Sequence, residues 1–257
     1  MNLIEALLEN VPAGSQLDRI GRTQSMAWVI DGADALETNS IFSSPAHWLV
    51  DIFNEALSQD SSKTLKGSLE SAQKRVLQSP FANDIASLMK PKQGCFTLAI
   101  VKQVGEKVSF GVLGDAHIVL LKADNSVHHF SDMRIQAFSE KTRTKPTVKE
   151  KHEQMLVNRL SMNTSGGYWA GTAGDAWTSE VQYADFETES CKSVLLCSDG
   201  FWRAFAFGLV QGESILLEKT RLCEAYTILR EFESDTALEE IKRHDDVSAQ
   251  LLSISAM

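Results

Sequence analysis

Residues 26–34 read Met-Ala-Trp-Val-Ile-Asp-Gly-Ala-Asp, an apolar run that ends in an acidic residue and a glycine. The run Met26–Ile30 has the length and β-branched content of a buried strand. A carboxylate at the end of such a strand, here Asp31, is held rigidly but opens into a cleft, and Gly32 lets backbone carbonyls approach an ion. Carboxylate and carbonyl oxygens are ligands that Mg²⁺ and Mn²⁺ prefer. The stretch predicts a metal-binding strand end, although Asp-Gly is also a common turn.

Three further expected strand ends carry acids in the same way. They are Val112-Leu113-Gly114-Asp115, Val194-Leu195-Leu196-Cys197-Ser198-Asp199-Gly200, and His244-Asp245-Asp246 just before a final strand over 247–254. Strand ends gather at one rim of a β-sandwich, where carboxylates raise one another's pKa unless cations neutralise them. No Lys or Arg directly flanks Asp31, Asp115 or Asp199, so metal ions are the natural counter-charge. A binuclear centre, with ions about 3.5–4 Å apart, would activate a water for attack on phosphorus.

Composition limits the remaining possibilities. The chain has 257 residues, 43% of them hydrophobic, and a net charge of −9. This length can bury a full core, and no linker or low-complexity tract divides it, so we expect a single domain over 1–257. The acidic balance argues against nucleic acid or an anionic membrane as partner. The four cysteines form no Cys-x-x-Cys pair, which argues against zinc and a redox dithiol.

Targeting signals are also missing from the sequence. The amphipathic stretch Met1–Pro12 has no basic region and does not resemble a signal peptide. No apolar run reaches transmembrane length. We therefore expect a cytoplasmic monomer.

Apolar periodicity predicts the secondary structure. Helical spacing predicts helices over 45–57, 61–77, 148–160, 213–220 and 222–233. Short β-type runs over 95–102, 108–113, 118–121 and 127–130 predict a meander of antiparallel strands, followed by strands over 181–186 and 193–198. The polar segment 13–24, the basic segment 139–147 and the glycine-rich segment 163–174 are expected to be loops. Strands flanked by helical pairs indicate an α+β fold with a β-sandwich covered by helices.

The ordered set Asp31-Gly32, Gly114-Asp115, Ser198-Asp199-Gly200 and Asp245-Asp246 resembles the type 2C (PPM) family of metal-dependent protein serine/threonine phosphatases, bacterial members in particular. The match runs from about Gln16 to Ser253. The resemblance implies a four-layer α-β-β-α sandwich of two antiparallel sheets flanked by helical layers. It also implies two Mn²⁺ or Mg²⁺ ions, a phosphorylated protein as substrate, and hydrolysis of phosphoserine or phosphothreonine without a phosphoenzyme.

The resemblance also implies roles for particular residues. Asp31 would bridge both ions, Gly32 would give its carbonyl to one, and Asp199 and Asp245 would hold the other. The remaining implied metal-site residues are Asp18, which would orient a metal-bound water, and Asp115, which with Asp199 would form a weaker third site. Asp31, Asp199 and Asp245 are the expected catalytic residues, and Met26–Ile30 and Val194–Cys197 are expected to be adjacent buried strands.

Three departures from the family pattern affect the catalytic hypothesis. Leu17 stands where the family usually has a glutamate ligand, Ala33 where some members have a histidine proposed as general acid, and Ala13 near the usual phosphate-binding arginine. Arg19 or Arg22 could substitute, with Arg19 as the candidate for contacting the substrate phosphate, or both could be solvated loop residues. These departures leave open a pseudophosphatase that binds a phosphoprotein without turnover.

A different phosphatase chemistry is also conceivable. Cys197 and Arg203 satisfy Cys-x5-Arg, the spacing of the nucleophile loop in cysteine phosphatases. That chemistry needs a depressed thiol pKa and a loop of small residues around the phosphate. Here Phe201 and Trp202 fill the loop and Asp199 lies beside the thiol. A buried structural thiol is therefore the favoured interpretation of Cys197.

Overall fold

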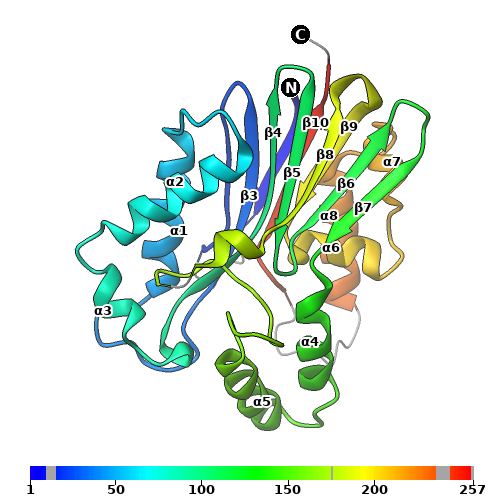
Figure 1. Ribbon diagram of the computed structural model, residues 1–257. Helices are drawn as coiled ribbons and strands as arrows, with labels where there is room; N and C mark the ends of the chain where they lie inside the picture. Colours follow the sequence, from blue (N-terminus) through cyan, green and yellow to red (C-terminus); the bar gives the residue numbers. More distant parts are fainter. Residues whose placement is uncertain (10–15, 175, 236–243, 256–257) are drawn as a thin grey trace.

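Two antiparallel five-stranded sheets face each other in the computed structural model, which describes residues 1–9, 16–174, 176–235 and 244–255 (Figure 1). The first sheet has the strand order β1 (Asn2–Glu9), β10 (Val247–Ser253), β9 (Cys191–Cys197), β6 (His117–Lys122) and β7 (Val127–Ser131). The second has the order β2 (Arg19–Arg22), β3 (Met26–Ala33), β4 (Cys95–Val104), β5 (Lys107–Leu113) and β8 (Gln182–Glu187).

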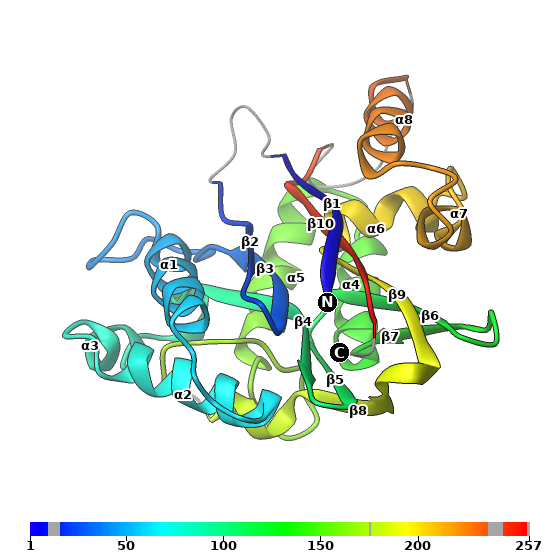
Figure 2. The same cartoon turned by 90° about the horizontal axis from the view of Figure 1, so that it is seen from above.

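Helices cover both outer faces of the sandwich. The second sheet is covered by α1 (Pro45–Ser58) and α2 (Leu65–Leu77), with α3 (Ala82–Ala86) beyond them, and the first sheet by α6 (Asp199–Ala206), α7 (Gly212–Leu216) and α8 (Leu222–Asp235) (Figures 1 and 2). A further pair, α4 (Gln136–Arg143) and α5 (Val148–Leu160), lies at one end of the sandwich. Short 3-10 turns lie at Lys90–Lys92, Met133–Ile135, Trp177–Glu180 and Thr188–Ser190. The predicted four-layer α+β sandwich is confirmed.

Strand β3 explains why the opening run is apolar at every position. Met26, Trp28 and Ile30 belong to the core beneath α1 and α2, whereas Ala27 and Val29 belong to the core between the two sheets. Since successive side chains of a strand point to opposite faces, a strand covered on both faces needs an unbroken apolar sequence. The predicted strand Met26–Ile30 is thus confirmed.

The predicted meander is wrong in one respect, because its four strands divide between the two sheets. β5 pairs with β4 and β8, whereas β6 pairs with β7 and β9. The chain crosses between the sheets at Gly114, whose φ is +71° and where a Cβ would lie 2.4 Å from Cγ2 of Thr97. Local periodicity does not distinguish a hairpin within one sheet from a crossing to the other.

The same division corrects the expected adjacency of Met26–Ile30 and Val194–Cys197. Both strands are buried, but β3 is hydrogen-bonded to β2 and β4, and β9 to β10 and β6. They lie in facing sheets with a shared core between them. Their ends therefore approach across the sandwich rather than along one sheet.

Two segments expected to be loops form regular structure, and so does the amphipathic N-terminal stretch, for which the sequence predicted no particular element. The amphipathic N-terminal stretch contains strand β1, paired along its length with β10, although its residues 10–12 lie outside the described part. The polar segment 13–24 contains strand β2, with residues 13–15 outside the described part. The basic segment 139–147 is helical through Arg143 in α4, with Phe138 packed on Tyr168. Partners distant in sequence stabilise these elements, and local composition did not reveal them.

The predicted helices are otherwise observed with small changes in their bounds, α7 being shorter than expected. Within the described residues, the structure contains no helix with the length and apolarity needed to cross a membrane.

Candidate active site

Acidic residues from five separate segments converge near the ends of β3 and β5 and the start of α6. Asp18 precedes β2, Asp31 lies near the end of β3, Asp115 follows β5, Asp199 is the first residue of α6, and Asp245 stands just before β10. Asp18 is buried and the other four are partly exposed. The structure thus brings together all of the predicted acidic site residues.

These carboxyls lie close enough to raise one another's pKa values. The pKa of Asp18 is raised to about 7, mainly by burial; the charges of Asp246, Asp199 and Asp245 also raise it, whereas a hydrogen bond from Ser248 lowers it. Burial raises the pKa of Asp31 well above its ordinary value, and Asp18 and a hydrogen-bonded Asp199 raise it further. Loss of hydration and like charge both disfavour the ionised form.

Asp115 belongs to the same electrostatic cluster. Its pKa is raised to about 7, mainly by burial and in part by the charges of Asp199 and Asp245. Because a group of carboxylates that disfavour one another's ionisation is stabilised by bound cations, the cluster has the electrostatic character of a cation site.

The backbone fixes Asp31 and Gly32 tightly. They pair with Thr97 and Phe96 in the ladder between β3 and β4. A Cβ at Gly32 would lie 2.7 Å from Cβ of Leu17 and 2.9 Å from the Leu17 carbonyl oxygen, so only glycine lets the chain before β2 pack here. Gly32 is therefore fixed in the strand directly after Asp31.

Gly200 is required on the opposite side of the site. A Cβ there would lie 2.0 Å from the carbonyl oxygen of Asp246. The start of α6 is also tied to β10, because Ser198 donates through its backbone N–H to the carbonyl of Ser248 (2.9 Å) and accepts at its hydroxyl from the Ser248 N–H (3.1 Å). The Asp-Gly sequence at 199–200 thus lets α6 and the segment 245–246 touch backbone to backbone.

The N-terminal motif is part of the site, but Leu17 is a core residue. Leu17 is 4% exposed, and its backbone N–H donates to Oδ2 of Asp246 (3.4 Å). Asp18 is 1% exposed and accepts a hydrogen bond at Oδ2 from the Ser248 hydroxyl (2.5 Å). Leu17, predicted to stand at the position of the family's glutamate, thus packs against Gly32.

Arg19 lies at the edge of the cluster, held by other groups. Its guanidinium pairs with Asp51 of α1 (2.7 Å) and donates to the carbonyls of Gln16 (2.6 Å) and Asp18 (2.8 Å). Arg22 is exposed at the end of the same strand. Ala13, which stands near the family's usual arginine, lies outside the described residues.

His117, two residues after Asp115, stacks with the rings of His129 and Trp202 at centroid distances of 5.2 and 4.0 Å. Burial, and then the charge of His129, lowers the pKa of His117 to about 3. An imidazole that is neutral near pH 7 keeps one weakly acidic N–H and lacks the imidazolium proton that a general acid donates.

The structure argues against cysteine-based chemistry at Cys197. This thiol is completely buried in the core beneath α6 and α8, and burial, followed by the charge of Asp199, raises its pKa. Arg203 forms an ion pair with Glu233 (2.9 Å). A reactive cysteine needs the opposite environment, accessible and with a stabilised thiolate.

Sequence reasoning missed the groups that orient the acids. Ser248 holds Asp18. The buried Arg159 of α5 donates to the Asp34 carbonyl (3.1 Å) just after the Asp31-Gly32 motif, and the buried Glu233 of α8 lies beside His244. The only sequence signals were a polar residue in an apolar strand and charges on otherwise ordinary helices. These partners are 11 to 230 residues away from the groups they contact.

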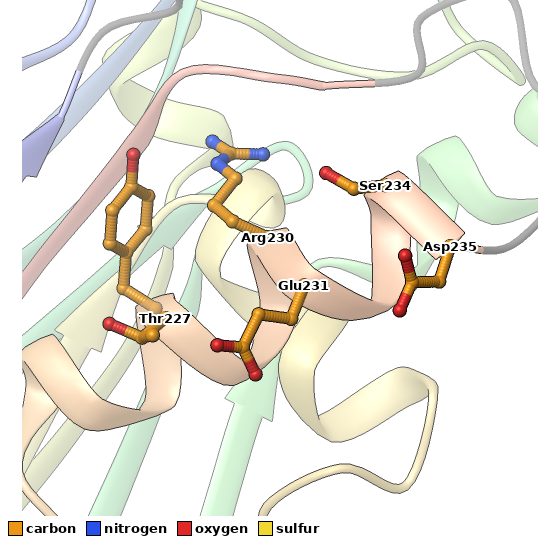
Figure 3. Close-up of a pocket in the computed structure, with 6 residues that line it drawn as sticks. Thr227, Arg230, Glu231, Ser234 and Asp235 are labelled. Atoms are coloured by element: carbon orange, nitrogen blue, oxygen red, sulfur yellow. The ribbon is translucent and has the colours of Figure 1, made fainter.

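Two further observations concern metal ligands and pockets. In the described part of the chain, no three His, Cys, Asp or Glu side chains are already arranged to hold a metal ion. A pocket of about 410 Å³ lies on α8, lined by Tyr226, Thr227, Arg230, Glu231, Ser234 and Asp235 (Figure 3). None of the clustered acids lines that pocket, and its mixed charges suit no single class of ligand.

Comparison with known proteins identifies a family for this chain. Residues 17–240 match the family model of protein phosphatase 2C. No curated protein sequence matches the chain.

Solved structures share the fold at low sequence identity. The serine/threonine phosphatase Stp1 from Staphylococcus aureus is 12% identical, with a TM-score of 0.61 and coverage of 99% of this chain and 96% of that one. The serine/threonine phosphatase PstP/Ppp of Mycobacterium tuberculosis is 15% identical, with a TM-score of 0.54 and coverage of 97% and 96%. The catalytic domain of PstP in complex with two manganese ions is 15% identical, with a TM-score of 0.56 and coverage of 98% and 96%.

The family model spans most of the chain and includes Asp18, Asp31, Asp115 and Asp199. Its match confirms the resemblance seen in the sequence motifs and the enzyme class that they predicted. The chain therefore belongs to the protein phosphatase 2C family, the metal-dependent protein serine/threonine phosphatases.

Proposed function

We propose that this chain hydrolyses phosphoserine and phosphothreonine in proteins, with two Mn²⁺ or Mg²⁺ ions bound among the clustered acids. The observation that carries the proposal is the convergence of Asp18, Asp31, Asp115 and Asp199 from four segments, close enough to raise one another's pKa. Family membership and the manganese-bound relative support it.

The residues present suit hard divalent cations. Their donors are carboxylate oxygens and the Gly32 carbonyl, the kind that Mg²⁺ and Mn²⁺ bind. We assign Asp31 to both ions, Gly32 to one, and Asp199 and Asp245 to the other, with Asp115 and Asp199 as a weaker third site. When bound, the ions supply positive charge that polarises water and phosphoryl oxygens.

The chain's own groups would orient the reactants. Asp18 accepts from the Ser248 hydroxyl at one carboxyl oxygen, which leaves its other oxygen to accept a hydrogen bond from the attacking water. Arg19 is the cation that we propose to contact the substrate phosphate, and it would exchange Asp51 for the phosphate to do so. We further propose that residues 1–257 act as one domain and as a cytoplasmic monomer on phosphoprotein substrates.

The direct experiment is hydrolysis of a phosphoserine peptide by the purified chain. The expected result is phosphate release that requires added Mn²⁺ or Mg²⁺ and stops with a chelator, with Asp199→Asn inactive and Cys197→Ser active. Release that persists in chelator and disappears in Cys197→Ser would contradict the proposal and restore the cysteine mechanism.

One observation favours a second candidate function, a pseudophosphatase that binds a phosphoprotein without turnover. Leu17 is buried where the family usually has a glutamate ligand, so one ion would have one fewer anionic ligand. Binding of the phosphopeptide with no phosphate release at saturating Mn²⁺ would select this function over hydrolysis.

A further inference from the structure

A buried carboxylate outside the acidic cluster connects two of its members. The side chain of Glu233, near the end of α8, is 0% exposed. It pairs with Arg203 of α6 (2.9 Å), with Arg230 one turn earlier in α8 and with Nδ1 of His244 (2.9 Å). We call these four residues the Glu233 hub.

Each partner of Glu233 leads toward an acid of the site. Arg203 lies four residues after Asp199, one turn further along α6. His244 immediately precedes Asp245. Arg230 contacts Glu233 and also donates to the backbone carbonyl of Asp245. The hub therefore connects the helix that carries Asp199 to the segment that carries Asp245.

Figure 3 shows one member of the hub, Arg230, among the side chains that line the pocket on α8. Arg230 points from the helix toward the start of β10, whereas Glu231 and Asp235 point the other way. Arg230 thus both lines the pocket on this helix and belongs to the hub.

Asp245 depends on such contacts because it precedes the sheet ladders. The first residue of β10 to pair with β1 is Val247, and the first to pair with β9 is Ala249. Buried ion pairs contribute little to stability on average, because desolvation offsets their attraction. They do fix the relative positions of the elements that they join.

We infer that Glu233 is a positioning residue that sets the place of Asp245 relative to Asp199, and through them the affinity for the divalent ion that these two acids share. The inference rests on the proposed function, which assigns both acids to one ion. Glu233 lies outside the cluster itself and acts through Arg203, Arg230 and His244.

The test compares Glu233→Gln with a control variant, Asp60→Asn, that also neutralises a buried carboxylate. Asp60, whose side chain is 2% exposed, pairs with Lys102 (2.8 Å). Lys102 pairs with Met26, the first residue of β3, whereas Asp31 pairs with Thr97 further along the same ladder. Asp60→Asn thus removes a buried carboxylate charge away from the acids. Mn²⁺ affinity by calorimetry and thermal unfolding are measured for the full chain and each variant.

Glu233→Gln is expected to weaken Mn²⁺ binding roughly 10- to 100-fold, as loss of groups that orient metal ligands typically does. Added Mn²⁺ should then recover most of the hydrolysis rate. Asp60→Asn is expected to lower the melting temperature with unchanged Mn²⁺ affinity. If Glu233→Gln fails to fold, Arg230→Lys provides a second test. Lysine keeps the positive charge but lacks the forked guanidinium donors that contact both Glu233 and Asp245. This variant should also weaken Mn²⁺ binding.

Unchanged Mn²⁺ affinity in a folded Glu233→Gln or Arg230→Lys protein would overturn the inference, as would an equal loss in Asp60→Asn. Such results leave the proposed function standing if the wild-type chain binds Mn²⁺ and hydrolyses the peptide. A wild-type chain that binds no Mn²⁺ would overturn the proposed function, and this inference with it.

Discussion

Asp31 and Asp245 are placed by different kinds of interaction. Asp31 lies within the ladder between β3 and β4, so backbone hydrogen bonds on a buried strand determine where its carboxyl points. Asp245 lies before the ladders of β10 and is held by the contacts of Arg230 and His244 with α8. One side of the site is thus fixed by the sheet, and the other by side chains.

This difference teaches which parts of such a site tolerate change. A strand-held ligand keeps its place as long as the sheet is folded. A ligand held by side chains can lose its place through a single substitution far from the ion. We therefore expect substitutions on the two sides to act on different measurable quantities.

Removal of the carboxylate held by the sheet should have the largest effect. Asp31→Asn is expected to lower the rate of peptide dephosphorylation by more than about 100-fold, since loss of groups that only orient metal ligands already costs 10- to 100-fold. Asp124→Asn, in the exposed turn after β6, is the control and should retain the wild-type rate. Equal rates for wild type and Asp31→Asn would remove Asp31 from the reaction.

A carboxylate introduced beside Asp31 should be the next most disruptive change. Leu17→Glu buries a charge beside Gly32 and Asp246, and without metal it is expected to lower the free energy of unfolding by roughly 3 kcal/mol. Urea unfolding with and without Mn²⁺ provides the measurement, and Leu17→Met, which keeps an apolar side chain, is the control.

The metal response of Leu17→Glu sharpens the comparison. If the new carboxylate reaches the ion assigned to Asp31 and Gly32, Mn²⁺ should restore part of the lost stability and bind more tightly than in wild type. A stable Leu17→Glu protein with unchanged Mn²⁺ affinity would show that Leu17 does not occupy the position of the family's glutamate.

A methyl group added next to the segment 245–246 should have a smaller effect on stability. Gly200→Ala places a methyl group against the Asp246 carbonyl and is expected to cost about 2 kcal/mol, with weaker Mn²⁺ binding as the segment 245–246 shifts. Gly212→Ala at the start of α7 meets no atom closer than 4.0 Å and should change neither quantity. Full stability and full Mn²⁺ affinity in Gly200→Ala would rule out the close backbone contact.

The smallest effect is expected at the edge of the site. Arg19→Ala should raise KM for the phosphopeptide roughly tenfold with little change in kcat, the low end of what a hydrogen bond to a charged group contributes. Arg22→Ala, on the same strand and exposed, is the control. If both variants match wild type, Arg19 is a structural partner of Asp51 and does not contact the phosphate.

The same contrast explains how much could be predicted from the sequence. Strand β3, the helices α1, α2, α5 and α8, and the acidic strand ends could be read from apolar periodicity and Asp-Gly pairs because the signals are local. The strand-held side of the site is therefore visible in one short stretch, residues 26–34.

What could not be predicted depends on partners distant in sequence. The crossing at Gly114 separates β5 from β6, and strand β1 exists only through its pairing with β10, more than 200 residues away. Glu233 reads as an ordinary charge on a helix until the fold places it beside Arg203 and His244. Leu17 reads as a ligand position in the family motif, and only its packing against Gly32 makes it a core residue.

The central claim is that the clustered acids bind divalent ions which the hydrolysis requires. Calorimetric titration of Mn²⁺ into wild type and Asp31→Asn, with phosphopeptide hydrolysis measured on the same samples, tests it most directly. We predict two bound ions in wild type, loss of at least one in Asp31→Asn, and hydrolysis that rises with occupancy. Hydrolysis at full rate by wild type without bound Mn²⁺ or Mg²⁺, or identical titrations for the two proteins, would contradict the claim.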